Sequence, residues 1–185
     1  MVWLFAAEAR ALAADAETAS ETRGARSKAV AATVMAIACV ETFLNTQARL
    51  LLFRDPTFAH RQTIERDLKA KKALGRKLDE WPLLMFGKKA DFGSGPAQRF
   101  KVMLDRRNDL MHFISETHAF QGDGFIINGL MDTTALDSLK PADGWNSVQA
   151  AEDFIEYLLA LQGVAADQLP HALHHWIGKV PPRVA

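Results

Sequence analysis

Apolar residues recur every three or four positions along residues 100–114, the spacing of an amphipathic helix. At about 100° per residue, Arg107 falls near the middle of this apolar stripe. Asn108 and His112 follow on one flank, four positions apart and therefore on the same side. An arginine on a buried face needs a partner or a functional reason, because an unpaired charge out of water is costly. The stripe itself consists of Phe100, Met103, Leu104, Leu110, Met111 and Ile114.

A second long stripe lies in residues 27–53, which contain no glycine or proline and predict a long helix. Glu41 interrupts this stripe, and Asn45 follows one turn later on the same side. Glu41 is the candidate buried partner of Arg107, because a carboxylate matches the planar guanidinium group. The apolar positions of the stripe are Val30, Val34, Ile37, Leu44, Ala48, Leu51 and Leu52.

The remaining pattern predicts an all-α fold, a bundle of five to six helices in a single domain over residues 1–185. Asp55 is expected to cap the third helix, with Pro56 at its first position. Residues 117–145 are rich in glycine, and we expect a short β-hairpin or a loop insertion there. Helices are expected at residues 3–20, 27–53, 57–74, 96–116, 146–162 and 166–177, with a short one at 78–86 broken at Trp81-Pro82.

The composition is that of an ordinary globular protein, with 49% hydrophobic and 24% charged residues, and so it adds little to the predicted fold. Cys39 is the single cysteine, which excludes disulfide frameworks within one chain, and its apolar surroundings predict a buried, inert thiol. The apolar runs fall short of the roughly 18 residues of a membrane span. We therefore expect a cytoplasmic protein that does not enter a membrane.

Charge is balanced over the whole chain but uneven along it. Residues 61–107 hold 13 Lys and Arg against 6 Asp and Glu, whereas residues 108–185 hold 3 against 10. The acidic last part argues against indiscriminate binding of nucleic acid. The basic run is either a solvated helix face or a phosphate-binding surface, and consists of Arg61, Arg66, Lys69, Lys71, Lys72, Arg76 and Lys77.

Three histidines near the C-terminus have a spacing that chelates metals in some proteins, at His171, His174 and His175. No carboxylate pattern completes such a site, so surface histidines are the favoured interpretation. We expect neither a metal nor a cofactor.

Two segments together resemble the HEPN superfamily: Val40-Glu-Thr-Phe-Leu-Asn45 and Arg107-Asn-Asp-Leu-Met-His112. The hallmark of that family is an arginine, four to six residues, and a histidine, commonly with a small polar residue right after the arginine. Arg107, Asn108 and His112 fit this form, and Arg106 satisfies the looser spacing. The order of helices is similar over roughly residues 27–162. The resemblance implies a homodimeric bundle in which two motifs face each other and, in active members, act as a metal-independent endoribonuclease.

The chemistry that the resemblance implies suits these residue types. RNA supplies its own nucleophile, the 2′-hydroxyl, so a histidine acting as general acid and base and an arginine that stabilises the phosphorane charge are sufficient. Histidine titrates near neutral pH, which suits both proton transfers. Asn108 would orient His112 or a phosphate oxygen, and the products would be a 2′,3′-cyclic phosphate and a 5′-hydroxyl.

Two other interpretations stay open at this point. One is a non-catalytic RNA-binding or protein-interaction module with the same fold, and the other is a purely structural Arg107–Glu41 pair beside an ordinary helix histidine. The resemblance further implies a role in a toxin–antitoxin system or in anti-phage defence, with RNA as substrate and an antitoxin as a candidate partner.

Overall fold

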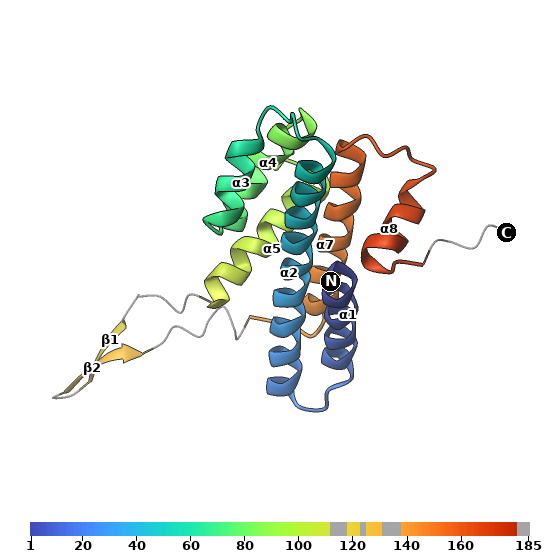
Figure 1. The fold of residues 1–185 in the computed structure, drawn as a ribbon. Helices are drawn as coiled ribbons and strands as arrows, with labels where there is room; N and C mark the ends of the chain where they lie inside the picture. The colour runs from blue at the N-terminus through green and yellow to red at the C-terminus, as the bar shows by residue number, and fades with distance from the viewer. Residues whose placement is uncertain (112–117, 123–124, 131–137, 181–185) are drawn as a thin grey trace.

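The chain folds as a bundle of helices around one long central helix, α2 (Thr22–Arg54), as Figure 1 shows. The computed structural model describes residues 1–111, 118–122, 125–130 and 138–180. The all-α prediction is confirmed, with seven helices in these ranges instead of five or six. The other helices are α1 (Val2–Thr18), α3 (Arg61–Lys69), α4 (Leu74–Phe86), α5 (Gly95–Met111), α7 (Ala142–Leu161) and α8 (Leu169–Ile177).

The helices cover α2 in two groups. Along most of its length, α2 packs against α1 and α7, and α8 packs on α1 and α7. Towards its C-terminal end α2 contacts α3 and α4, while α5 crosses α2 and α7 obliquely (Figure 1). The end of α5 therefore lies beside the bundle and not inside it.

One antiparallel strand pair, β1 (His118–Gly122) and β2 (Phe125–Leu130), lies in the glycine-rich connection for which the sequence suggested a hairpin or a loop insertion. Phe120 is opposite Ile127 and Gly122 is opposite Phe125, with an irregular register near His118. In Figure 1 the pair lies away from the helices.

Small residues line the contact of α7 with α1 and α2. A Cβ atom added to Gly144 of α7 would lie 3.3 Å from Cα of Ala13 and 3.5 Å from Cα of Ala29, so three backbones approach closely here. This small-residue seam corrects the predicted stripe of α2, because Val30 and Val34 are only half-buried. The predicted Ile37, Leu44, Ala48 and Leu52 are buried, but the first half of α2 buries mainly alanines. The buried alanines of the two helices are Ala6, Ala9, Ala13 and Ala16 of α1 and Ala25, Ala29, Ala32, Ala36 and Ala48 of α2.

Aromatic side chains fix α5 against α7. The rings of Phe100 on α5 and Phe154 on α7 stack with centroids 4.6 Å apart, and both side chains are fully buried. Stacking of this kind adds about 0.5–1.5 kcal/mol to the burial of the rings. This contact sets the position along α7 at which α5 crosses it.

The helices after α2 begin and end at residues that differ from the prediction. Asp55 accepts hydrogen bonds from the backbone and hydroxyl of Thr57, but helix α3 begins only at Arg61. It ends at Lys69 and not near residue 74, because Lys71 has a left-handed backbone with φ of 50°. Helix α4 then runs through Pro82 unbroken, with the proline itself and the preceding Leu78 and Trp81 buried.

A buried hydrogen-bond network around Asp67 joins α3 to α4. Trp81 Nε1 donates to Asp67 Oδ2 at 3.2 Å, and Lys72 Nζ bridges Asp67 at 2.9 Å and Glu80 at 2.6 Å. Burial alone would raise the pKa of Asp67, but the hydrogen bonds from Lys72 and Trp81 outweigh it and hold the pKa below its ordinary value. The hydrogen bonds that Lys72 donates to Asp67 and Glu80 raise the pKa of Lys72.

Helix α2 overturns the expectation that no segment is apolar enough to cross a membrane. By length and composition alone α2 passes that test. Half of its most apolar stretch is buried inside the bundle, and the core helix of a soluble protein passes the same test. The burial of α2 is that of a core helix in the bundle, and the cytoplasmic location stays a prediction.

The small-residue seam predicts opposite effects for two glycine substitutions. Gly144→Ala should lower the free energy of unfolding by about 1–2 kcal/mol, because crowding against the Ala13 backbone outweighs the gain in helix propensity. In α4, a Cβ atom added to Gly75 would have no atom within 4 Å. Gly75→Ala should therefore raise the free energy of unfolding by up to about 1 kcal/mol. Urea unfolding of both variants measures this, and a stabilising Gly144→Ala would contradict the close approach.

The lowered pKa of Asp67 predicts that the fold loses stability in acid. Because the folded-state pKa of Asp67 lies below the ordinary value of 3.8, its carboxylate stabilises the fold above that pH. This stabilisation by the Asp67 carboxylate is lost as the pH falls from about 3.8 through the folded-state pKa. Asp67→Asn should therefore destabilise the protein at pH 7 and much less at pH 3, as measured by urea unfolding. The exposed Asp79→Asn on α4 is the control, and an Asp67→Asn effect equal at both pH values would contradict the prediction.

Candidate functional site

Helix α5 carries three of the predicted site residues at its C-terminal end. Arg106, Arg107 and Asn108 are all half-buried. Arg107 lies three positions after the buried Leu104, and so it continues the buried face of the helix as the sequence predicted. His112 follows the last described residue of α5 and lies outside the described residues, so its role stays a prediction.

The other two predicted residues, Glu41 and Asn45, are held by a lysine of α4. Lys77 Nζ donates to Glu41 Oε1 at 2.7 Å and to Asn45 Oδ1 at 3.0 Å. The Lys77 side chain is only 4% exposed, and its ammonium group lies 5.4 Å from the centre of the Trp81 ring. A buried ammonium needs such partners, because its desolvation is costly.

The predicted pairing of Glu41 with Arg107 was therefore wrong, since the partner of Glu41 is Lys77. The helix that reaches this part of α2 is α4, for which the sequence suggested a short helix broken at Trp81-Pro82. Within the described residues, Arg107 has neither a hydrogen bond nor an ion pair of its own. Its guanidinium group is thus available to an anion that the protein binds.

Arg106 has a partner on α7. Its Nη2 atom lies 3.1 Å from Asp143 Oδ2, and the same oxygen accepts a hydrogen bond from the backbone N–H of Lys140 at 2.8 Å. Asp143 is in the first turn of α7, where a carboxylate is favourable. One turn later, Ser147 donates to the Asp143 carbonyl at 2.8 Å and exchanges a hydrogen bond with Thr33 of α2.

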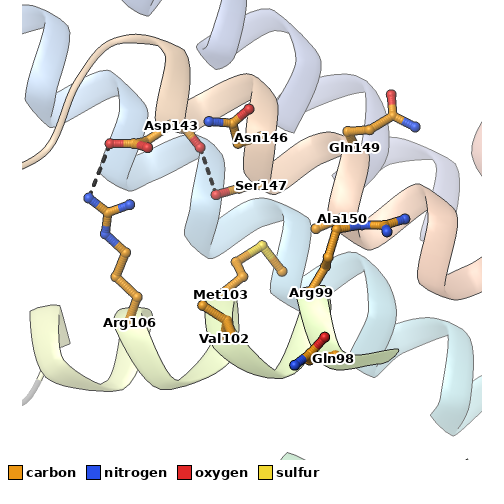
Figure 2. Close-up of a pocket in the computed structure, with 10 residues that line it drawn as sticks. All are labelled: Gln98, Arg99, Val102, Met103, Arg106, Asp143, Asn146, Ser147, Gln149 and Ala150. Carbon is orange, nitrogen blue, oxygen red and sulfur yellow. Dashed lines mark hydrogen bonds and ion pairs between the residues drawn. The ribbon is translucent and has the colours of Figure 1, made fainter. Parts of the chain in front are cut away.

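Arg106 and Asp143 stand at one end of a groove between α5 and α7 (Figure 2). Its volume is about 430 Å³, within the range of roughly 300–1,000 Å³ for small-ligand sites. Arg99 lies at the other end, with Nη2 at 2.8 Å from Asp153 Oδ2. Ion pairs as exposed as these contribute only about 0–1 kcal/mol each. The groove is lined by residues that include Gln98, Arg99, Val102, Arg106, Asn146 and Gln149.

Sequence reasoning missed this groove, although the sequence contains a signal for it. Arg99 and Arg106 are seven residues apart, two turns of a helix, and therefore lie on one face. Two acidic residues of the later helix, Asp143 and Asp153, are placed to meet them. The prediction began that helix at residue 146, so Asp143 was assigned to a connection.

The basic run of residues 61–77 is only partly available to a ligand. Arg61 is bonded to Glu65 at 2.9 Å and to the carbonyl of Leu52 at 2.8 Å. Lys72 and Lys77 are engaged in the buried contacts of α3 and α4 with their neighbours. Three exposed residues of this run have no ion pair in the described part of the chain, namely Lys69, Lys71 and Arg76.

Neither the cysteine nor the histidines form a reactive cluster in the structure. Cys39 is buried, and burial raises the pKa of its thiol to about 12, so it stays protonated at neutral pH. His171, His174 and His175 are exposed on or near the surface of α8. Over the described residues, no group of three or more His, Cys, Asp or Glu side chains is placed to hold a metal ion.

Comparisons of the chain with models of protein families, with curated proteins and with solved structures give no match. The resemblance to the HEPN superfamily therefore stays a prediction from residues 40–45 and 107–112. What supports a function is the chemistry of the residues at the end of α5 and around it.

The ion pairs predict which residues are energetically coupled. In a double-mutant cycle, Glu41→Gln and Lys77→Met should show a coupling of about 1–3 kcal/mol, because each substitution leaves the other group without its partner. Glu41→Gln and Arg107→Ala should add to within about 0.5 kcal/mol. Urea unfolding of the single and double variants measures both cycles. Strong coupling of Glu41 to Arg107, with none to Lys77, would contradict the structure.

Proposed function

We propose that the chain is a metal-independent endoribonuclease of HEPN type that acts as a homodimer, with Arg107, Asn108 and His112 as its catalytic residues. The observation that carries the proposal is the state of Arg107, half-buried at the end of α5 and without an anionic partner among the described residues. A half-buried cation without a partner is unfavourable for stability alone, so a functional reason for it is favoured.

The surroundings of Arg107 suit stabilisation of a phosphorane. A charge that is partly removed from water interacts more strongly with an opposite charge than an exposed one does. In RNA cleavage by the 2′-hydroxyl, negative charge builds up on the non-bridging phosphate oxygens, where a planar guanidinium donates two hydrogen bonds. Asn108 is the next residue on α5 and would hold a phosphate oxygen or His112.

A homodimer would supply separate groups for the two proton transfers of this reaction. One group must remove the proton of the 2′-hydroxyl and another must donate a proton to the leaving 5′-oxygen. Each chain supplies one histidine in the motif, so two copies of His112 would supply the base and the acid at once. Two copies of Arg107 would likewise double the charge facing the phosphate.

Glu41, Asn45 and Arg106 are proposed as supporting residues. Glu41 and Asn45 position α4 on α2 through Lys77. Arg106 joins the C-terminal part of α5 to the start of α7 through Asp143. We place this activity in the cytoplasm, in a toxin–antitoxin or anti-phage system with an antitoxin as partner.

The alternative function is a non-catalytic RNA-binding or protein-interaction module. In this case Arg107 would bind a phosphate of intact RNA or an acidic group of a partner protein. The loss of the Arg107–Glu41 pair removes the structural reason that first favoured this alternative, whereas an unpaired Arg107 is compatible with both functions.

Substitution of the motif residues tests the proposal. His112→Ala and Arg107→Ala should each abolish RNA cleavage in EDTA, with rates reduced by at least about 100-fold, and leave the helical content unchanged. Cleavage is followed on a 5′-labelled single-stranded RNA, and the 2′,3′-cyclic phosphate is identified by mass spectrometry.

Lys101→Ala is the matched control, because Lys101 is an exposed basic residue of α5 that pairs with Asp105. It should cleave at the rate of the unchanged protein. Cleavage that continues at full rate in His112→Ala and Arg107→Ala would refute the proposal. An unchanged protein that binds RNA without cleaving it, with Arg107→Ala altering the monomer–dimer equilibrium, would establish the alternative.

A further inference from the structure

The groove between α5 and α7 combines an exposed apolar floor with a polar rim. Val102 is 62% exposed on α5, and the buried Met103 and Ala150 lie behind it. Three amide side chains surround this floor, Gln98 from α5 and Asn146 and Gln149 from α7, and all three are exposed (Figure 2). A flat apolar ligand with hydrogen-bonding edges suits such a site, and a nucleobase has that chemistry.

Two arginines add the charge that a nucleotide needs. Arg99 and Arg106 are separated by about 10 Å along α5, and both line the groove. Arg106 can exchange Asp143 for a phosphate, because Asp143 keeps its hydrogen bond from the Lys140 backbone. The guanidinium group of Arg99 offers a planar surface on which an unstacked base can lie.

One residue of the groove is next in sequence to the proposed catalytic residues. Arg106 and Arg107 are neighbours on α5, and their side chains leave the helix about 100° apart. A single strand that passes over the end of α5 can therefore contact both, with one phosphate at Arg107 and the next unit at Arg106. Duplex RNA does not offer unstacked bases to such a groove.

We propose that this groove binds one nucleotide of single-stranded RNA adjacent to the cleaved phosphate. The base lies on Val102 between the amide groups, and the phosphate of that nucleotide bonds Arg106. This inference rests on the proposed function for its substrate, but it concerns binding, and it can be tested without cleavage. A peptide or a second copy of the chain in the groove is an alternative occupant that the test separates.

The test uses the full chain with His112→Ala, so that RNA stays intact, and a fluorescein-labelled single-stranded RNA followed by anisotropy. In this background Arg106→Ala should weaken binding roughly 10- to 100-fold, as expected for a lost charge-assisted hydrogen bond. Val102→Asp should weaken it about tenfold by placing a charge on the floor. Leu83→Asp on α4 makes a similar change at a 43% exposed position outside the groove and should stay within about twofold.

Salt dependence separates direct contact from an indirect structural effect. Arg106→Ala should reduce the slope of log K against log salt by about 0.7, one phosphate contact on a single strand, whereas Arg106→Lys should keep the slope. Circular dichroism and thermal unfolding verify that each variant is folded. Unlabelled duplex RNA should compete poorly with the single strand.

The outcomes of this test and of the cleavage test are independent. Weakened binding in the two groove variants supports the groove even if the unchanged protein cleaves nothing. Two results would overturn the proposal that the groove binds RNA, whatever the cleavage assay shows. One is that the groove variants bind RNA as tightly as the His112→Ala parent does, and the other is that this parent binds no RNA. Groove variants that alter the oligomeric state and leave RNA affinity unchanged would assign the groove to a second copy.

Discussion

The close approach of α7 to α1 and α2 at Gly144 is the contact on which the arrangement of the other helices depends. A Cβ atom at this position would lie only 3.3 Å from Cα of Ala13 and 3.5 Å from Cα of Ala29. Tight contact between small residues fixes the position of α7 along its neighbours, since interiors pack without room to slide. Helix α5 is in turn placed on α7 by the stacked rings of Phe100 and Phe154. The location of the candidate site thus depends in part on the contact of α7 with the alanines of α1 and α2.

Charge pairing then decides which polar residues are free to act. The buried ammonium of Lys77 requires acceptors, and Glu41 and Asn45 supply them. Glu41 pairs with Lys77, and Arg107 has no carboxylate partner among the described residues. The methylene groups of a lysine can also cover apolar surface, which makes a basic residue compatible with this buried position. The ion pair of Lys77 with Glu41 thus supports the contact of α4 with α2.

Helix α5 presents two different chemistries on two of its faces. The face towards α7 holds Arg99 and Arg106 in exposed ion pairs around an apolar floor, and such pairs exchange partners readily. The adjacent face carries Arg107 and Asn108, which have no such partners in the described part of the chain. A strand of RNA that meets the first face for binding would meet the second for chemistry. Rigid packing of α5 through Phe100 keeps both faces in one orientation, which catalysis by positioned charges requires.

The sequence by itself determined the helical character of the chain and the long helix α2, because periodic apolar spacing is a local property. It also placed Arg107 on the buried side of α5 and identified Cys39 as an inert core residue. Only the tertiary structure decided the partner of Glu41, the groove between α5 and α7 and the passage of α4 through Pro82. These depend on which helix lies across which, and helix crossings are set by the shapes of buried residues such as Gly144. A pattern along one helix contains no record of the neighbour that its side chains will meet.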